Sequence, residues 1–141
     1  MRVRLLGTLV VVFAVYGAAA PAFAHHGFTV EFDANKCANM KGTLSGITWE
    51  NPHAYLQMDV KGADGQTHTW NLEMVTPNAL KRTGTTKEDF KSNMGKTINA
   101  FACPSKAGDN RGAAGYLALS DGLIRLVGQI QGQKTDADKH F

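Results

Sequence analysis

The stretch KGTLSGITWENPHAYLQMDVKGADGQTHTWNLEM, residues 41–74, decides the fold. It contains three runs rich in residues that favour strands, and turn residues separate them. In the second run polar and apolar side chains alternate, so that Leu56 and Met58 share one face while Tyr55 and Gln57 share the other. Asp64-Gly65 is a strong hairpin signal. The stretch therefore predicts three consecutive antiparallel strands, each with one face in the core.

Two helical signals follow these strands. Thr76 suits an N-cap and Pro77 the first helical position, and Gly84 ends the segment. Thr85 and Glu88 have the spacing of a capping box, which predicts a second short helix that ends near Lys91.

The remaining elements complete a small barrel. Residues 96–103 predict a strand, and residues 114–128 predict a closing hairpin around Asp121-Gly122. Three strands, a helical segment and two or three further strands are the element order of a small, five-stranded, partly open barrel of the OB type. Gly46 inside the first strand indicates a bulge in a strand that bends around the barrel. The predicted class is all-β with a short helical segment, and the alternative is a small antiparallel β-sandwich.

The amino-terminal segment predicts export. A basic start, MRVR, precedes the uncharged run LLGTLVVVFAVYGAAA at residues 5–20, which is short for a membrane span of about 20 residues. We expect residues 1–24 to be a signal peptide, 25–40 an extended arm, 41–128 the barrel and 129–141 a flexible polar tail. The mature protein is then periplasmic or secreted, with no transmembrane segment.

Signal removal also changes the charge. The chain has 15 Lys plus Arg against 12 Asp plus Glu, and loss of Arg2 and Arg4 leaves 13 against 12, a formal charge of +1. With no cluster of like charge, electrostatic binding to nucleic acid or lipid is not expected.

Cys37 and Cys103 are the two cysteines. An even pair in an exported protein predicts a disulfide, here closing a ring around residues 38–102. By chain entropy such a ring stabilises the fold by about 4 kcal/mol. The alternative is a soft metal site, which the absence of CxxC spacing disfavours.

Two adjacent histidines follow the predicted cleavage site. Cleavage after Ala24 makes His25 the first residue, so that its amine and imidazole can bind one ion and His26 can add a further nitrogen. Cleavage after Ala22 instead leaves Phe23 first, with His25 at position three. Nitrogen-rich sets of either kind suit Cu(II), with Zn or no metal as the alternatives. The pair can also be a solvated polar start.

His53 is the third candidate ligand. It follows the turn Asn51-Pro52 and begins a strand on the polar face, where the mature terminus could reach it if the arm folds back. Asp33 or Glu50 could add an oxygen ligand. Without a metal, His53 holds the turn by hydrogen bonds and Asp33 is an ordinary turn residue. His68, on the apolar face, is expected to be a satisfied edge histidine.

The sequence features that would indicate a function other than metal binding are weaker. Trp49, Tyr55 and Trp70 could form a face for an unknown envelope protein or small ligand, although core packing is the simpler role. No nucleophile elbow, phosphate loop or dinucleotide fingerprint is present, so enzyme activity is not expected. Copper-dependent oxidation at an amino-terminal histidine remains a minor alternative.

Four motifs, AHHGFTVEFD, W-x-NPH, PNALKRTG and GYLALSDG, resemble those of a family of small exported bacterial proteins of uncharacterised function. The resemblance covers nearly all of residues 24–122 and implies no activity. The chain differs from the family pattern in Gly27, where serine is usual, and in its two cysteines, which makes the disulfide a feature of this protein. The matching residues are His25, His26, Phe28, Phe32, Asp33, Trp49, Asn51, Pro52, His53, Pro77, Asn78 and Leu80.

Overall fold

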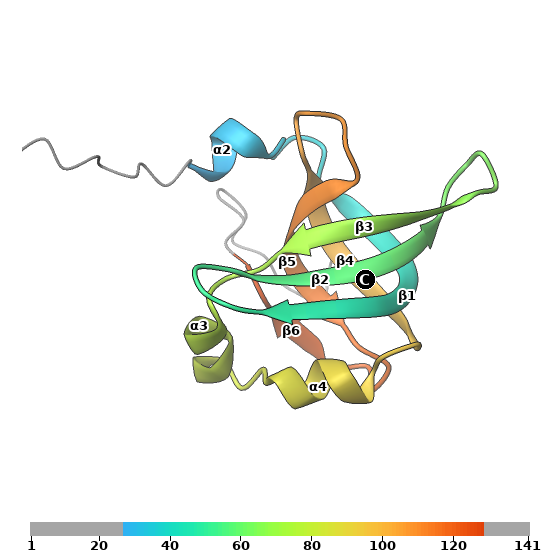
Figure 1. Cartoon of the computed structure of the whole chain (residues 1–141). Coiled ribbons are helices and arrows are strands. Elements are labelled where there is room, and N and C mark those ends of the chain that lie inside the picture. The colour runs from blue at the N-terminus through green and yellow to red at the C-terminus, as the bar shows by residue number, and fades with distance from the viewer. Residues whose placement is uncertain (1–26, 129–141) are drawn as a thin grey trace, which may run out of the picture.

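A computed structural model describes residues 27–128 of the chain. Its strands are β1 (Ala38–Trp49), β2 (Ala54–Lys61), β3 (Thr67–Glu73), β4 (Thr97–Pro104), β5 (Arg111–Ala118) and β6 (Ile124–Leu126) (Figure 1). Its helices are α2 (Phe28–Glu31), α3 (Pro77–Arg82) and α4 (Lys87–Ser92). His25 and His26, the predicted signal peptide and the predicted tail lie outside the described residues.

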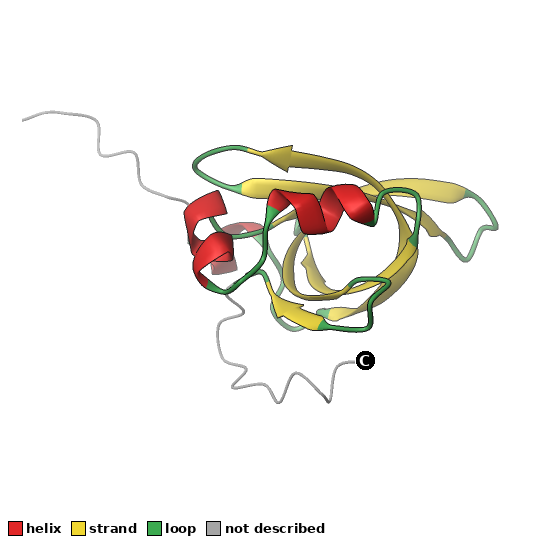
Figure 2. Cartoon of the chain, turned by 90° about the horizontal axis from the view of Figure 1, so that it is seen from below, coloured by secondary structure: helices red, strands yellow, loops and turns green. Residues whose placement is uncertain are grey.

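The strands close into a barrel. The sheet has the order β3-β2-β1-β4-β5-β6, and a parallel pairing of β3 with β5 joins its two sides. This pairing runs from Asn71 opposite Arg111 to Glu73 opposite Ala113. Five strands therefore form a closed ring, seen end-on in Figure 2, and β6 is an extra strand beside β5. The OB-like barrel is confirmed, and because β3 and β5 pair, it is closed and is not a two-sheet sandwich.

The bulge at Gly46 lies where β1 changes from pairing with one neighbouring strand to pairing with another. The first half of β1 pairs with β4, the second half pairs with β2, and the register shifts between Leu44 and Gly46. A Cβ atom on Gly46 would collide with the side chain of Gln57. The predicted bulge is thus present where the strand turns from one partner to the other. Pairing of Ala38 with Ala102 also starts the barrel three residues earlier than predicted.

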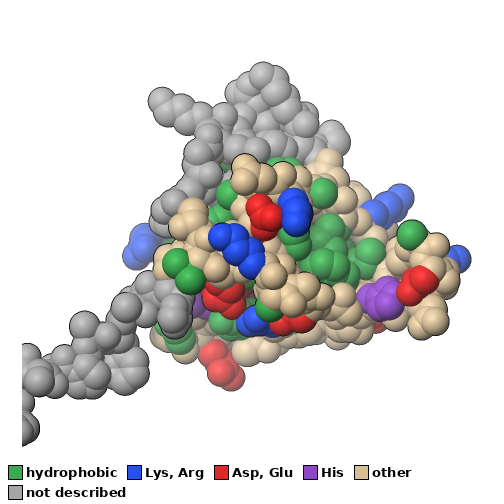
Figure 3. All heavy atoms as spheres, turned by 90° about the horizontal axis from the view of Figure 1, so that it is seen from above, with side chains coloured by type: hydrophobic (Ala, Val, Ile, Leu, Met, Phe, Trp, Pro, Cys, Tyr) green, Lys and Arg blue, Asp and Glu red, His purple; other side chains and the backbone are tan. Residues whose placement is uncertain are grey.

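Alternation in the strands builds the core as predicted. The inward residues of β2 and β3, among them Leu56, Met58 and Leu72, are fully buried. Phe90 of α4 is also fully buried, and α4 covers one end of the barrel (Figure 2). Figure 3 shows the opposite side, on which α2 lies in Figure 1, and hydrophobic side chains gather on that face.

The helical segment follows its predicted caps with one shift. Thr76 accepts a hydrogen bond from the backbone N–H of Ala79, as an N-cap does. The capping box of α4, however, joins Thr86 and Asp89, not Thr85 and Glu88. Thr85 is buried, and its N–H donates a hydrogen bond to the backbone oxygen of Leu80 in α3. The predicted capping box was therefore one residue too early.

The arm is also different from the prediction. The alternation of Phe28, Val30 and Phe32 predicted an extended segment, but residues 28–31 form one helical turn. Phe28 and Phe32 are four residues apart, which brings them to one side of a helix, and their ring centroids lie 5.5 Å apart. Phe32 is buried against Cys103 and Ala113, so packing on the barrel decides the local conformation.

Candidate functional site

His53 lies where β2 begins, directly after the Asn51-Pro52 turn, and its side chain is about one-third exposed. Its Nδ1 is 3.0 Å from the backbone oxygen of Met74 and 3.4 Å from Oε1 of Glu73. Strand pairing places both of these groups beside His53, because backbone hydrogen bonds join its neighbour Ala54 to Met74 and to Val75. The register of the β2–β3 hairpin thus aims one edge of the imidazole at the end of β3.

The contacts of His53 indicate which of its two ring nitrogens carries the proton. A backbone carbonyl can only accept, so Nδ1 carries the proton when the ring is neutral. The lone pair is then on Nε2. Within residues 27–128 the recorded hydrogen bond and ion pair of His53 both involve Nδ1, so Nε2 is the ring nitrogen without a recorded partner in that range.

Glu73 lies between His53 and Tyr55. Its Oε2 accepts a hydrogen bond from the Tyr55 hydroxyl at 3.2 Å, and the two residues are direct cross-strand partners. Partial burial, and then the charge of Glu73, raise the pKa of Tyr55. No lysine or arginine in the described part of the chain makes an ion pair with Glu73. Within residues 27–128 its recorded side-chain contacts are the Tyr55 hydroxyl and the imidazole of His53.

Two adjoining cavities open beside these side chains. One, of about 170 Å³, is lined by residues that include Phe28, Phe32, His53 and Glu73. The other, of about 270 Å³, is lined by Glu31, Phe32, Tyr55, Asn71, Glu73, Arg111 and Gly112. Phe32 and Glu73 line both, so we name the pair of cavities the His53 cleft.

Helix α2 forms one wall of the His53 cleft and is fixed to the barrel. Arg111 of β5 makes an ion pair with Glu31 at 3.0 Å, and the N–H of Lys106 donates to the backbone oxygen of Glu31 at 2.9 Å. The side chain of Lys106 also donates to the backbone oxygen of Thr29. These contacts, together with buried Phe32, hold the first described residues beside His53.

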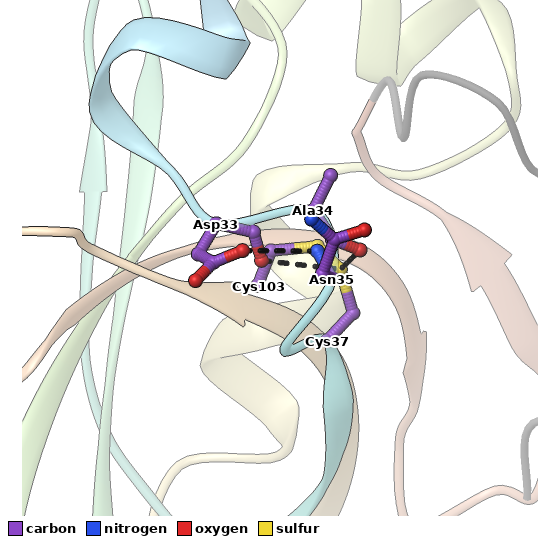
Figure 4. The surroundings of a disulfide bond; sticks show 5 residues. All are labelled: Asp33, Ala34, Asn35, Cys37 and Cys103. Atoms are coloured by element: carbon purple, nitrogen blue, oxygen red, sulfur yellow. Dashed lines mark hydrogen bonds between the residues drawn. A yellow bond between two sulfur atoms is a disulfide. The ribbon is translucent and has the colours of Figure 1, made fainter.

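The predicted disulfide is confirmed. Cys37, just before β1, is bonded to Cys103 of β4, and Figure 4 shows the bond beside the turn formed by residues 33–35. Cys103 is fully buried next to Phe32 and Ala113. The Sγ atom of Cys37 is 3.2 Å from the backbone oxygen of Ala34. The bond therefore joins the base of the arm to the barrel in the same apolar cluster that holds α2.

The side chain of Asp33 makes contacts within the turn formed by residues 33–35. Its carboxylate accepts from the N–H of Asn35 at 3.1 Å and lies 3.3 Å from Nζ of Lys36. The hydrogen bond from Asn35 and the nearby Lys36 hold the pKa of Asp33 below its ordinary value. It does not line the His53 cleft, and Glu50 is exposed at the end of β1.

The residues predicted as metal ligands are not all within residues 27–128. In that range no three His, Cys, Asp or Glu side chains are grouped so that they could hold a metal ion. Of the predicted ligands, His53 lines the cleft, Asp33 lies at the turn and His25 and His26 precede the described residues. Their role in metal binding stays a prediction.

The three aromatic residues predicted as a binding face do not share one face. Trp49 packs on Phe90 with ring centroids 5.9 Å apart, and Trp70 packs against the core opposite Met58. Tyr55 points outward into the His53 cleft. Trp70 also lines a separate cavity of about 210 Å³, together with Lys36, Ala38, Met40, Ala102 and Pro104.

Sequence reasoning missed Glu73. The signal for it was the hairpin register: counting outward from the Asp64-Gly65 turn pairs Tyr55 with Glu73 and brings His53 beside the residues that follow β3. His68, in contrast, has the predicted satisfied arrangement, since its Nε2 lies 2.8 Å from a carboxylate oxygen of Asp64.

Within residues 27–128 no helix has the length and apolar character needed to cross a membrane.

No curated protein and no solved structure matched the chain. One family model matches residues 13–114, which is most of the chain. The protein therefore belongs to DUF6152, a family of unknown function.

Proposed function

We propose that this protein is a small exported binding protein that holds one Cu(II) ion between its mature amino terminus and His53. The donors are the amine and imidazole of His25, the imidazole of His26 and Nε2 of His53. Three imidazoles and an amine form a nitrogen-rich set, which binds Cu(II) more tightly than Zn(II) or Ni(II).

One observation carries the proposal: Phe28 and His53 line the same cavity. Only Gly27 separates His26 from Phe28. An extended chain spans at most about 3.5 Å per residue, so the Cα atom of His26 lies within about 7 Å of that of Phe28. This short separation along the chain supports a site shared by the two histidines and His53.

The electrostatics of the His53 cleft support a cation. Nε2 of His53 has a free lone pair, and Glu73 contributes a negative charge that no lysine or arginine of the described chain neutralises. Arg111, the one guanidinium of the cleft, is already paired with Glu31 and Asp109. A divalent cation therefore meets a site whose net charge is negative.

The test is a Cu(II) titration of the full exported chain, with competition against a chelator of known affinity. His53→Ala removes the proposed ligand. His68→Ala is its matched control, because His68 also lies beside a carboxylate but is far along the hairpin from the cleft. A third form carries one extra residue before the mature terminus.

We expect His53→Ala and the extended form each to weaken Cu(II) binding at least tenfold, while His68→Ala binds as the wild type does. The same titration with Zn(II) is expected to give weaker binding. Equal Cu(II) affinity in all four proteins would contradict the proposal.

The cavity beside Trp70 favours a second candidate, a metal-free accessory module that captures an envelope partner or small ligand at the open end of the barrel. Under that function His53→Ala has no effect and Trp70→Ala abolishes capture. Pull-down from envelope extract with the two variants, each first checked for folding, separates this candidate from copper binding.

A further inference from the structure

We propose that Glu73 is a positioning residue that keeps His53 in the Nδ1–H tautomer and so makes Nε2 the metal-binding atom. The inference rests on the proposed function and adds to it the group that orients the ligand. It follows from three side chains, Tyr55, Glu73 and His53, and from one backbone oxygen.

The first step is the orientation of the carboxylate. Tyr55 and Glu73 are opposite each other on β2 and β3, and the Tyr55 hydroxyl donates to Oε2 at 3.2 Å. This hydrogen bond turns the other oxygen, Oε1, toward His53, where it lies 3.4 Å from Nδ1. Both strands are well-paired parts of the barrel, so the carboxylate is supported by rigid backbone.

The second step is the choice of tautomer. Nδ1 faces two groups that only accept, the backbone oxygen of Met74 at 3.0 Å and Oε1 of Glu73. The neutral imidazole has one N–H, and the acceptors around one nitrogen decide which nitrogen carries it. Here both acceptors favour a proton on Nδ1 and a lone pair on Nε2.

The third step is the consequence for a metal. A histidine whose second nitrogen donates to a carboxylate or carbonyl is a more basic and better oriented ligand, and loss of such a partner typically costs 10–100-fold in metal affinity. Glu73 lies on the Nδ1 side of the ring, and its two oxygens face Tyr55 and His53. It therefore acts through His53, and is not itself counted as a ligand.

The first measurement uses no metal. Nitrogen-15 NMR of the imidazole, above the pH at which the ring protonates, distinguishes the two tautomers. Wild-type protein is expected to show a protonated Nδ1 and an unprotonated Nε2 at His53. In Glu73→Ala the Nε2–H form should gain population, because one of the two acceptors is gone. Glu73→Gln keeps an acceptor oxygen and should retain more of the Nδ1–H form.

Two controls separate positioning from a general structural effect. Tyr55→Phe removes the hydroxyl that orients Glu73, and should shift the His53 tautomer in the same direction by a smaller amount. Asp64→Ala removes the carboxylate beside His68 and should change the ring signals of His68 alone. Backbone amide spectra show whether each variant keeps the barrel.

The second measurement is Cu(II) affinity, expected to fall about 10–100-fold in Glu73→Ala. A folded Glu73→Ala variant with the His53 ring signals of the wild type would overturn the inference, even if His53 binds copper. A tautomer shift without any effect of His53→Ala on copper would instead overturn the proposed function, and of this inference it would leave only the control of the tautomer by Glu73.

Discussion

The backbone oxygen of Met74 lies 3.0 Å from Nδ1 of His53, across the pairing of β2 with β3. A main-chain group that is fixed by the sheet therefore orients an imidazole that lines the His53 cleft. This arrangement is compatible with a ligand role, because the ring is held without using Nε2.

His53→Ala should cost little stability. The side chain is about one-third exposed, so the oxygen of Met74 can bond to water when the imidazole is removed. We expect the free energy of unfolding to fall by less than about 1 kcal/mol, as for other partly exposed side chains. Urea unfolding checks this; a loss of several kcal/mol would mean that the copper titration of this variant reports misfolding.

Phe32→Ala should detach α2 from the barrel. Phe32 is 5% exposed and is the buried residue that holds this helix against Cys103 and Ala113. Truncation of a buried phenylalanine costs about 3–5 kcal/mol. If the proposed function holds, copper affinity should fall as well, since Phe28 and the rest of α2 are no longer held beside His53.

Val30→Ala is the matched control for that variant, because Val30 is on the same helical turn and is 64% exposed. We expect it to change stability by less than about 0.5 kcal/mol. Similar losses of stability in the two variants would contradict the assigned packing of α2.

Removal of the disulfide should destabilise the fold without changing the barrel. Cys37 and Cys103 are 66 residues apart in the chain, and closing a ring of that size is worth about 4 kcal/mol by chain entropy. Thermal unfolding of a Cys37→Ser, Cys103→Ser double variant should occur at a clearly lower temperature. A reductant should lower the midpoint of the wild type and leave that of the double variant unchanged; equal midpoints in all samples would refute the bond's stabilising role.

Asp121 should make stability depend on pH in the acidic range. Hydrogen bonds from the guanidinium of Arg125 and from the N–H of Leu123 lower its pKa from 3.8 to about 2. A lowered folded-state pKa means that the folded chain releases this proton more readily than the unfolded chain, so the carboxylate stabilises the fold above about pH 3.8. That contribution is lost as the pH falls toward about 2.

Asp121→Asn tests this directly. At pH 7 the variant should unfold at a lower temperature than the wild type, and the difference should shrink as the pH is lowered from about 4 toward 2. A difference that stays constant across this range would show that the ion pair with Arg125 does not couple to folding.

Local signals predicted the strands and helices well. Alternation in residues 53–60, the Asp64-Gly65 turn and the Thr76-Pro77 start of α3 all act within a few residues, and the structure confirms each. The capping box shifted by one residue: the N–H of Thr85 donates to the backbone oxygen of Leu80 at the end of α3, and the N-cap of α4 is Thr86.

The missed features depend on distant pairing. The arm became helical because Phe32 packs on β4 and β5, more than 70 residues away in the chain. Closure of the barrel by β3 and β5, and the approach of Glu73 to His53, also required strand register. The candidate ligand His53 could be predicted from its turn, but its carboxylate partner could not be assigned without that register.

The most direct measurement is the intact mass and metal content of the protein purified from the periplasm of its native host. The account predicts a mature chain that begins at His25, with the two cysteines oxidised and close to one copper ion per chain. A chain that begins elsewhere, or one that begins at His25 but ignores added Cu(II), would contradict it.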